Sequence, residues 1–245
     1  MRPISGGVCT ICGERLFSSY AFAGAEGESR CGLCRRIEPA FARAAAYGSY
    51  ESGLRELIHL LKYGGVRPAA NVLGRMLAEA IASLEPAFPA DSIAVIPVPL
   101  HRTKLRQRRF NQAELIARAA ITLKGSGDRL LVYSGVLERK RDTASQIGLT
   151  SHQRRENLRG AFRVSQPEAV NGREVLVVDD VYTTGATVSE CARVLRRAGA
   201  TKVWVATVAR TLKVSAQHIE IRQGNDQGEE SSDVPEIPLA RAVGG

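Results

Sequence analysis

Two aspartates followed by a turn rich in hydroxyl groups form the most distinctive chemical pattern in the chain. Asp179 and Asp180 follow the apolar run Glu174–Val178, which predicts a strand buried on both faces. Residues 183–187 then read Thr-Thr-Gly-Ala-Thr and lead into a predicted helix over residues 188–198. The backbone N–H groups of such a turn, together with the N-terminus of the helix, are typical of a site for a phosphate monoester.

The two carboxylates indicate that phosphate alone is not the ligand. They would repel a bare phosphate, but they can accept hydrogen bonds from a ribose diol or contact a divalent cation. Thr183, Thr184 and Thr187 supply hydroxyl donors, and Gly185 permits close approach of the backbone. The pattern therefore favours a phosphorylated ribose bound with a divalent cation. The alternative is that a threonine only caps the helix while the aspartates pair with surface cations.

Four of the five cysteines form two Cys-x-x-Cys pairs, Cys9 with Cys12 and Cys31 with Cys34, with eighteen residues between the pairs. Two such pairs brought together by a hairpin make the four-thiolate site of a structural zinc ribbon. The alternatives are two disulfides in a secreted domain, or a redox-active pair. The N-terminus has no apolar segment typical of a secretory signal. We therefore expect structural zinc and a cytoplasmic protein.

Positive charge is concentrated in the middle of the chain. The 245 residues carry 34 Lys and Arg against 25 Asp and Glu, a net charge of +9, and residues 101–162 alone hold fourteen basic and five acidic residues. This block favours an anionic partner, either a small phosphate compound or a nucleic acid, and the alternative is an ordinary solvated surface. No apolar run reaches the roughly 20 residues of a membrane span, so we expect none.

Helices and strands alternate along most of the chain. Hydrophobic periodicity predicts helices at 54–62, 72–84, 110–123 and 188–198, and strands at 93–98, 130–133, 174–178 and 202–208. This alternation favours an α/β fold with a doubly wound parallel sheet, whose ligands bind at the carboxyl ends of the strands. We expect a zinc ribbon over 1–43, the α/β domain over 44–210, and a polar, disordered tail over 211–245.

The segment Val175–Thr187 resembles the signature of type I phosphoribosyltransferases that binds phosphoribosyl pyrophosphate (PRPP). From Cys9 to Arg210 the chain resembles the ComF family, which joins an N-terminal zinc ribbon to a phosphoribosyltransferase-like domain. Besides the cysteines and the signature, the segments that carry this resemblance are 61–63, 96–99, 106–112, 141–146, 154–157 and 160–162.

The resemblance implies a role for each matching residue. Asp179 and Asp180 would be catalytic residues that bind the ribose hydroxyls, and Mg²⁺ would bridge these hydroxyls and the pyrophosphate. The residues implied in binding PRPP are Asp179, Asp180, Val181, Tyr182, Thr183, Thr184, Gly185, Ala186 and Thr187. Those implied in binding pyrophosphate or another anion are Lys62 and, in the predicted loop after Pro99, Arg106, Arg108 and Arg109.

Two departures from related sequences bear on function. Arg109 stands where the family usually has glycine, so we expect a changed loop backbone. Thr183 stands where purine-salvage relatives often carry an acidic general base. Orotate and adenine phosphoribosyltransferases also lack this acid, so its absence does not exclude catalysis. The resemblance implies a phosphoribosyltransferase with an unidentified acceptor, linked to DNA uptake in natural transformation. The alternative is a non-catalytic protein that binds single-stranded DNA or uses the PRPP site as a sensor.

Overall fold

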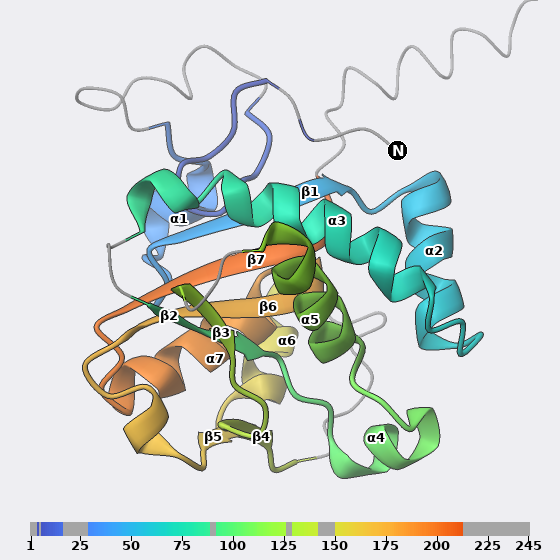
Figure 1. Ribbon diagram of the computed structural model, residues 1–245. Coiled ribbons are helices and arrows are strands. Elements are labelled where there is room, and N and C mark those ends of the chain that lie inside the picture. The colour runs from blue at the N-terminus through green and yellow to red at the C-terminus, as the bar shows by residue number, and fades with distance from the viewer. Residues whose placement is uncertain are drawn as a thin grey trace, which may run out of the picture. The chain divides into compact units, whose positions relative to one another are not determined.

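A five-stranded parallel sheet forms the centre of the described chain (Figure 1). The computed structural model describes residues 4, 6–16, 29–88, 92–125, 129–141 and 150–212, except for the side chains at 151, 152 and 155. The strand order is β1-β7-β6-β2-β3, and all neighbouring strands are parallel. The strands are β1 Arg43–Ser49, β2 Ile93–Pro97, β3 Leu130–Val132, β6 Glu174–Tyr182 and β7 Lys202–Arg210.

Helices cover both faces of this sheet, as a doubly wound fold requires. On one face, α3 (Ala69–Ala82) packs on β1 and β7, and α5 (Gln112–Lys124) packs on β2, β3 and β6 (Figure 1). α2 (Ser52–Lys62) packs against α3. On the other face, α7 (Ala186–Arg197) packs on β6 and β7, and α6 (Ser151–Leu158) packs against α7. The predicted fold class is therefore confirmed.

The sheet separates two hydrophobic cores, because successive side chains of a strand point to opposite faces. Val175 and Val177 of β6 are buried in the core that contains α7. Leu176 and Val178 of the same strand are buried in the core that contains α3 and α5. Burial on both faces explains why the strand sequences are continuous apolar runs.

Smaller elements surround the sheet. An antiparallel pair, β4 and β5, follows β3, and α4 follows β2. α1 carries Cys34, which is buried in the same core as Cys9, Cys12 and Phe41. The bounds are α1 Gly32–Arg36, α4 Arg102–Arg108, β4 Leu137–Arg139, β5 Phe162–Val164, and the 3-10 turns η2 Glu85–Ala87 and η4 Pro167–Ala169.

Two expectations about local structure are wrong. The strand predicted to end at Val178 continues to Tyr182, so both aspartates lie within β6, where Asp179 pairs in register with Thr207 of β7. The residues after Pro99 form a helix and not a loop, because their Arg, Lys, Leu and Gln side chains favour helix. The ring nitrogen of His101 caps α4 by accepting a hydrogen bond from the Thr103 N–H at 3.4 Å.

Parts of three expectations lie outside the described residues: the tail from 213 to 245, the family segment at 142–146, and the ribbon segment at 17–28. Across the ranges that are described, none of the helices combines the length and apolar character needed to cross a membrane.

Candidate functional site

The carboxyl end of β6 holds the two aspartates at different depths. Asp180 is buried, with 4% of its surface exposed, whereas Asp179 is half-buried. The backbone N–H of Asp180 donates a hydrogen bond to Oδ1 of Asp179 at 2.9 Å. The strand continues past both residues, so pairing within the sheet fixes the backbone of each aspartate.

Lys62, the last residue of α2, forms an ion pair with Asp180 through Nζ and Oδ2. Burial would lower the pKa of Lys62, but the Asp180 carboxylate outweighs burial and raises it. Burial would likewise raise the pKa of Asp180, but the Lys62 charge lowers it. Asp179 behaves in the opposite way, because burial and the charge of Asp180 both raise its pKa. The two aspartates therefore differ in their readiness to hold a proton.

A second cation reaches the same region from α4. Arg108 Nη1 donates to Gln112 Oε1 at 2.6 Å, and its guanidinium lies 5.5 Å from the ring centroid of Tyr63. Gln112 is the first residue of α5 and is itself buried. A hydrogen bond with Gln112 is also one of the contacts that lower the pKa of Asp180. The structure thus brings Lys62, Arg108 and Asp180 together through α2, α4 and α5.

Asn111 fixes the start of α5 beside this group. Its Oδ1 accepts a hydrogen bond from the Ala113 N–H at 3.1 Å, which caps the helix. Its Nδ2 donates to the carbonyl of Val98 at 3.0 Å, which joins the helix to the end of β2. Asn111 therefore positions Gln112 and the start of α5.

The turn after β6 has unsatisfied donors. Thr184 Oγ1 is buried and has no hydrogen-bond partner among the described residues. Gly185 precedes α7 with φ +77°, and no side chain caps the helix. The first turn of α7 carries no acidic residue that would occupy its N–H groups. A helix terminus of this kind can accept an anion.

Gly185 is required for a second reason, which is its contact with Tyr182. A Cβ at this position would overlap the hydroxyl oxygen of Tyr182. Tyr182 is itself buried, and burial raises the pKa of its phenol. The ring of Tyr182 therefore lies directly beneath the turn and limits the conformations that the turn can adopt.

The remaining predicted anion-binding residues lie at the surface. Arg106 and Arg109 are exposed and form no ion pair with a described residue. Arg109 has φ +64° and ends α4, so its backbone adopts the left-handed conformation that glycine adopts most readily. The arginine side chain thus stands on a backbone conformation that a glycine could also adopt. With Arg102, Lys104 and Arg106, it forms the basic α4 surface.

Two other cations of the basic block form ion pairs. Arg118 pairs with Glu114 at 2.9 Å, and Lys124 pairs with Glu85 at 3.1 Å. Arg141 donates to the carbonyls of Asn157 and Arg159. All four cations of the basic α4 surface are exposed. A cavity of about 680 Å³ adjoins α4 and the β4–β5 pair, and neither aspartate lines it.

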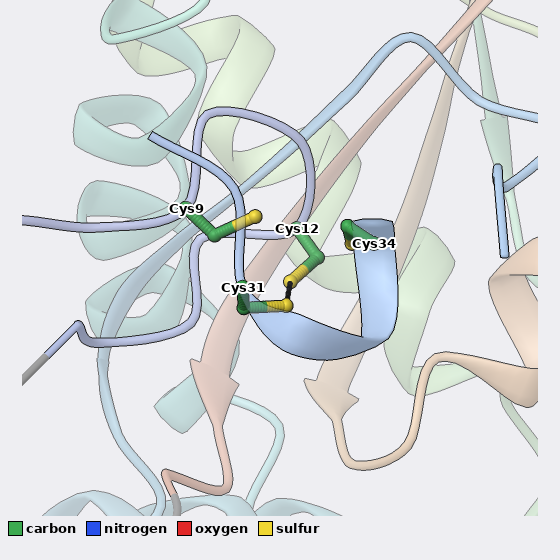
Figure 2. A group of neighbouring side chains, drawn as sticks. All are labelled: Cys9, Cys12, Cys31 and Cys34. Carbon is green, nitrogen blue, oxygen red and sulfur yellow. Dashed lines mark hydrogen bonds between the residues drawn. The ribbon is translucent and has the colours of Figure 1, made fainter. Parts of the chain in front are cut away.

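The four N-terminal cysteines converge on one point, as Figure 2 shows. Their sulfur atoms all lie within 4.8 Å of one another, and the sulfurs of Cys12 and Cys31 are 3.6 Å apart. Zn–S bonds of about 2.3 Å in a tetrahedron need sulfurs roughly 3.8 Å apart, so the cluster fits such a metal. Every cysteine in the described chain is reduced, so the disulfide alternative is not what the structure contains. The cluster could hold a metal such as zinc.

Sequence reasoning assigned no role to Gln112, Tyr63 or Arg210, which the structure places around the site. Tyr63 and Gln112 lie in the segments 61–63 and 106–112, which carry the family resemblance and also contain Lys62 and Arg108. Their place in these segments could have indicated that they lie near the same site. Arg210 gave no signal, because its importance arises from contacts with residues almost two hundred positions away.

Comparison with known proteins places the chain in a family. Residues 116–234 match the phosphoribosyl transferase domain. The DNA utilization protein YhgH of Escherichia coli O157:H7 is 33% identical over 214 residues, which cover 84% of this chain and 91% of that protein. Competence protein F of Haemophilus influenzae is 28% identical over 212 residues, covering 83% and 90%. Competence protein ComFC of Bacillus subtilis is 22% identical over 202 residues, covering 81% and 75%.

The matches to these three relatives extend over most of each chain. The protein belongs to the ComF family, and it combines a phosphoribosyltransferase-type domain with an N-terminal cysteine cluster.

Proposed function

We propose that this protein binds PRPP together with Mg²⁺ at the carboxyl end of β6. The observation that carries the proposal is the turn between β6 and α7. A buried threonine hydroxyl without a partner in the described chain and an uncapped helix N-terminus adjoin two aspartates. The 5′-phosphate would lie on residues 183–187, and the ribose hydroxyls would donate hydrogen bonds to Asp179 and Asp180.

The two aspartates would act differently in this complex. Asp180 is held ionised by Lys62, so it accepts a hydrogen bond from one ribose hydroxyl without needing to lose a proton. Asp179 gains a cationic neighbour when Mg²⁺ binds, which favours its ionised form. Carboxylate oxygens are ligands that Mg²⁺ accepts, and the ion would neutralise charge on the pyrophosphate.

Lys62 and Arg108 are the cations best placed for the pyrophosphate. Both are partly shielded from solvent, so their charges act more strongly than those of exposed residues. Departure of pyrophosphate from C1′ leaves a positive charge on the sugar and a negative charge on the leaving group. Lys62 and Arg108 would stabilise the leaving group by fixed electrostatics, and Asp179 and Asp180 would stabilise the sugar.

A phosphoribosyl transfer reaction also needs an acceptor. Thr183 is exposed at the position where related enzymes often carry an acidic base, so this chain supplies no carboxylate there. An acceptor that is already a good nucleophile would not need one. We therefore propose a transferase whose acceptor is nucleophilic enough to react without a carboxylate base at position 183.

The first experiment is titration calorimetry of the intact chain with PRPP and Mg²⁺. Asp180→Asn should weaken binding by about 10- to 100-fold, because a hydrogen bond to a charged group contributes roughly 1.5–3 kcal/mol. The matched control is Glu174→Gln at the other end of β6, where the carboxylate accepts from Trp204 Nε1. Equal affinity for the Asp180 variant and the wild type would contradict the site assignment.

The basic α4 surface favours a second function, binding of single-stranded DNA. The four cations of this surface are exposed, α4 contains no acidic residue, and relatives are named for DNA utilization and competence. Such a surface binds phosphates of any sequence, and it can act alongside a PRPP site. A cytoplasmic role in handling DNA during uptake is consistent with it.

Salt dependence tests this second function. Replacing Arg102, Lys104 and Arg106 with Gln should lower the slope of log affinity against log salt by about 2, since each lost phosphate contact removes ~0.7. Replacing the exposed Arg55, Arg75 and Lys202 with Gln removes the same charge elsewhere and should leave affinity higher than in the α4 variant. Equal loss in both variants would show that only net charge matters.

A further inference from the structure

Arg210 is a buried cation between the cysteine cluster and the turn after β6. It is the last residue of β7 and has 2% of its surface exposed. Burying a guanidinium is costly unless its donors are satisfied. Its contacts reach in two directions, one toward the N-terminal cysteines and one toward Tyr182.

On the cysteine side, Arg210 contacts the backbone that carries the metal ligands. Its Nη1 donates to the carbonyl of Cys12, and its Nη2 donates to Glu14 Oε2 at 2.7 Å. Both side chains of this ion pair are almost fully buried. The turn from Cys9 to Glu14 is closed by a hydrogen bond from the Cys9 N–H to the Glu14 carbonyl at 2.7 Å. The guanidinium is therefore fixed to the first Cys-x-x-Cys pair.

On the other side, Arg210 lies against Tyr182. The guanidinium carbon is 4.7 Å from the centroid of the Tyr182 ring. Phe41 contacts the same ring edge-on, with centroids 6.5 Å apart. The Tyr182 hydroxyl in turn occupies the space that a Cβ of Gly185 would take. A continuous series of contacts thus runs from the cysteine cluster through Arg210 and Tyr182 to Gly185.

We propose that Arg210 is a positioning residue that couples metal occupancy of the cysteine cluster to the conformation of the turn at residues 183–187. When the metal holds Cys9 and Cys12, their backbone holds Arg210, and Arg210 holds the Tyr182 ring beneath Gly185. Loss of the metal frees the Cys12 carbonyl to move, and the turn loses its support. The functional consequence rests on the proposed ribose phosphate site, but the structural coupling does not.

Amide hydrogen exchange on the intact chain tests the coupling without any ligand. Exchange at residues 183–187 is compared in the zinc-loaded protein, after removal of zinc by a chelator, and after zinc is restored. The proposal expects exchange to accelerate at least fivefold without zinc and to recover when zinc is restored. Unchanged exchange in this turn after zinc removal would overturn it.

Variants separate coupling from general loss of structure. Arg210→Lys keeps the charge but loses the planar fork, so the zinc-loaded variant should show fast exchange in the turn. Glu14→Gln is a milder second variant that weakens the same anchor if the first does not fold. Arg118→Lys changes an exposed pair with Glu114 and should behave as wild type. Wild-type protection in both zinc-loaded Arg210 and Glu14 variants would contradict the proposal.

A binding cycle then measures the functional consequence. Coupled sites affect each other's affinity by the same factor, typically 5- to 150-fold. Zinc should strengthen PRPP binding by about tenfold in the wild type, and this factor should fall toward 1 in Arg210→Lys. If PRPP does not bind at all, the proposed function fails, while the exchange experiment still decides the coupling. PRPP binding that is independent of zinc would contradict the coupling alone.

Discussion

Asp179 and Asp180 are adjacent in sequence, yet the fold gives them opposite electrostatic surroundings. Asp180 points its Oδ2 at Lys62, whereas Asp179 is left with a negative neighbour. Asp180 is therefore held in its ionised form, whereas ionisation of Asp179 is unfavourable. Functional sites commonly combine such groups, because a ligand then supplies the missing compensation.

The first prediction at this scale concerns Asp179→Asn. The folded-state pKa of Asp179 is raised, so its contribution to stability is present below its unfolded pKa of roughly 4 and is lost as pH rises through the folded pKa. The amide cannot ionise, so the variant should be more stable than wild type at pH 7 by about 1 kcal/mol, or ~2–4 °C in Tm. Thermal unfolding from pH 4 to pH 8 should show the difference growing with pH. A constant or inverted difference would refute the assignment.

The second prediction concerns Arg109→Gly. Arg109 occupies a left-handed conformation at φ +64°, which costs an L-residue about 1 kcal/mol. Glycine should therefore maintain or raise the free energy of unfolding by up to about 1 kcal/mol. Arg106→Gly, inside α4, should lower it by about 1 kcal/mol. Denaturant unfolding of both variants gives the comparison, and equal destabilisation would mean that Arg109 is not held in this conformation.

At the scale of elements, the connection from β6 to α7 combines a strand, a tight turn and an uncapped helix. Sequence patterns located this connection correctly, because apolar strands and hydroxyl-rich turns have local signatures. They placed the end of β6 four residues too early, because Asp is a poor indicator of a strand. Pairing with β7 as far as Tyr182 overrides that preference. They also missed α4, a helix of seven residues with no apolar stripe.

The third prediction tests this connection with Gly185→Ala. The new methyl group would meet Tyr182, so the variant should lose about 2–3 kcal/mol of stability and most phosphate affinity. Gly125→Ala is the matched control, since Gly125 has φ +58° and a Cβ added there would meet no atom of the described residues within 4 Å. The control should lose only the backbone term of about 1 kcal/mol. Chemical denaturation distinguishes them, and equal losses would mean that Tyr182 does not support the turn.

At the scale of the whole molecule, the cysteine cluster and the sheet share one hydrophobic core. Cys9, Cys12 and Cys34 are buried in the same cluster as Phe41 and Tyr182. The sequence could predict both the metal-ligand spacing and the parallel sheet, because each has a strong local pattern. It could not predict that Arg210 joins them, nor that Lys62 pairs with Asp180. Such contacts depend on the tertiary fold and leave no trace in spacing.

The fourth prediction concerns metal removal. Because the metal would hold part of this shared core, a chelator should lower the Tm of the whole described domain by ~5 °C or more. Differential scanning calorimetry should show one transition that shifts, and restored zinc should reverse the shift. A Tm that is independent of the chelator, with zinc confirmed absent by elemental analysis, would argue against a structural metal.

The central claim is that the turn after β6 binds the phosphate of a phosphorylated ribose while Asp179 and Asp180 bind its hydroxyls. A crystal structure of the intact protein with PRPP and Mg²⁺ tests it most directly. The account predicts the 5′-phosphate within hydrogen-bonding distance of Thr184 and the N–H groups of residues 185–187, with the ribose hydroxyls on the aspartates. PRPP bound instead in the cavity beside His101 and Arg102, with the Lys62–Asp180 pair and the turn untouched, would contradict it.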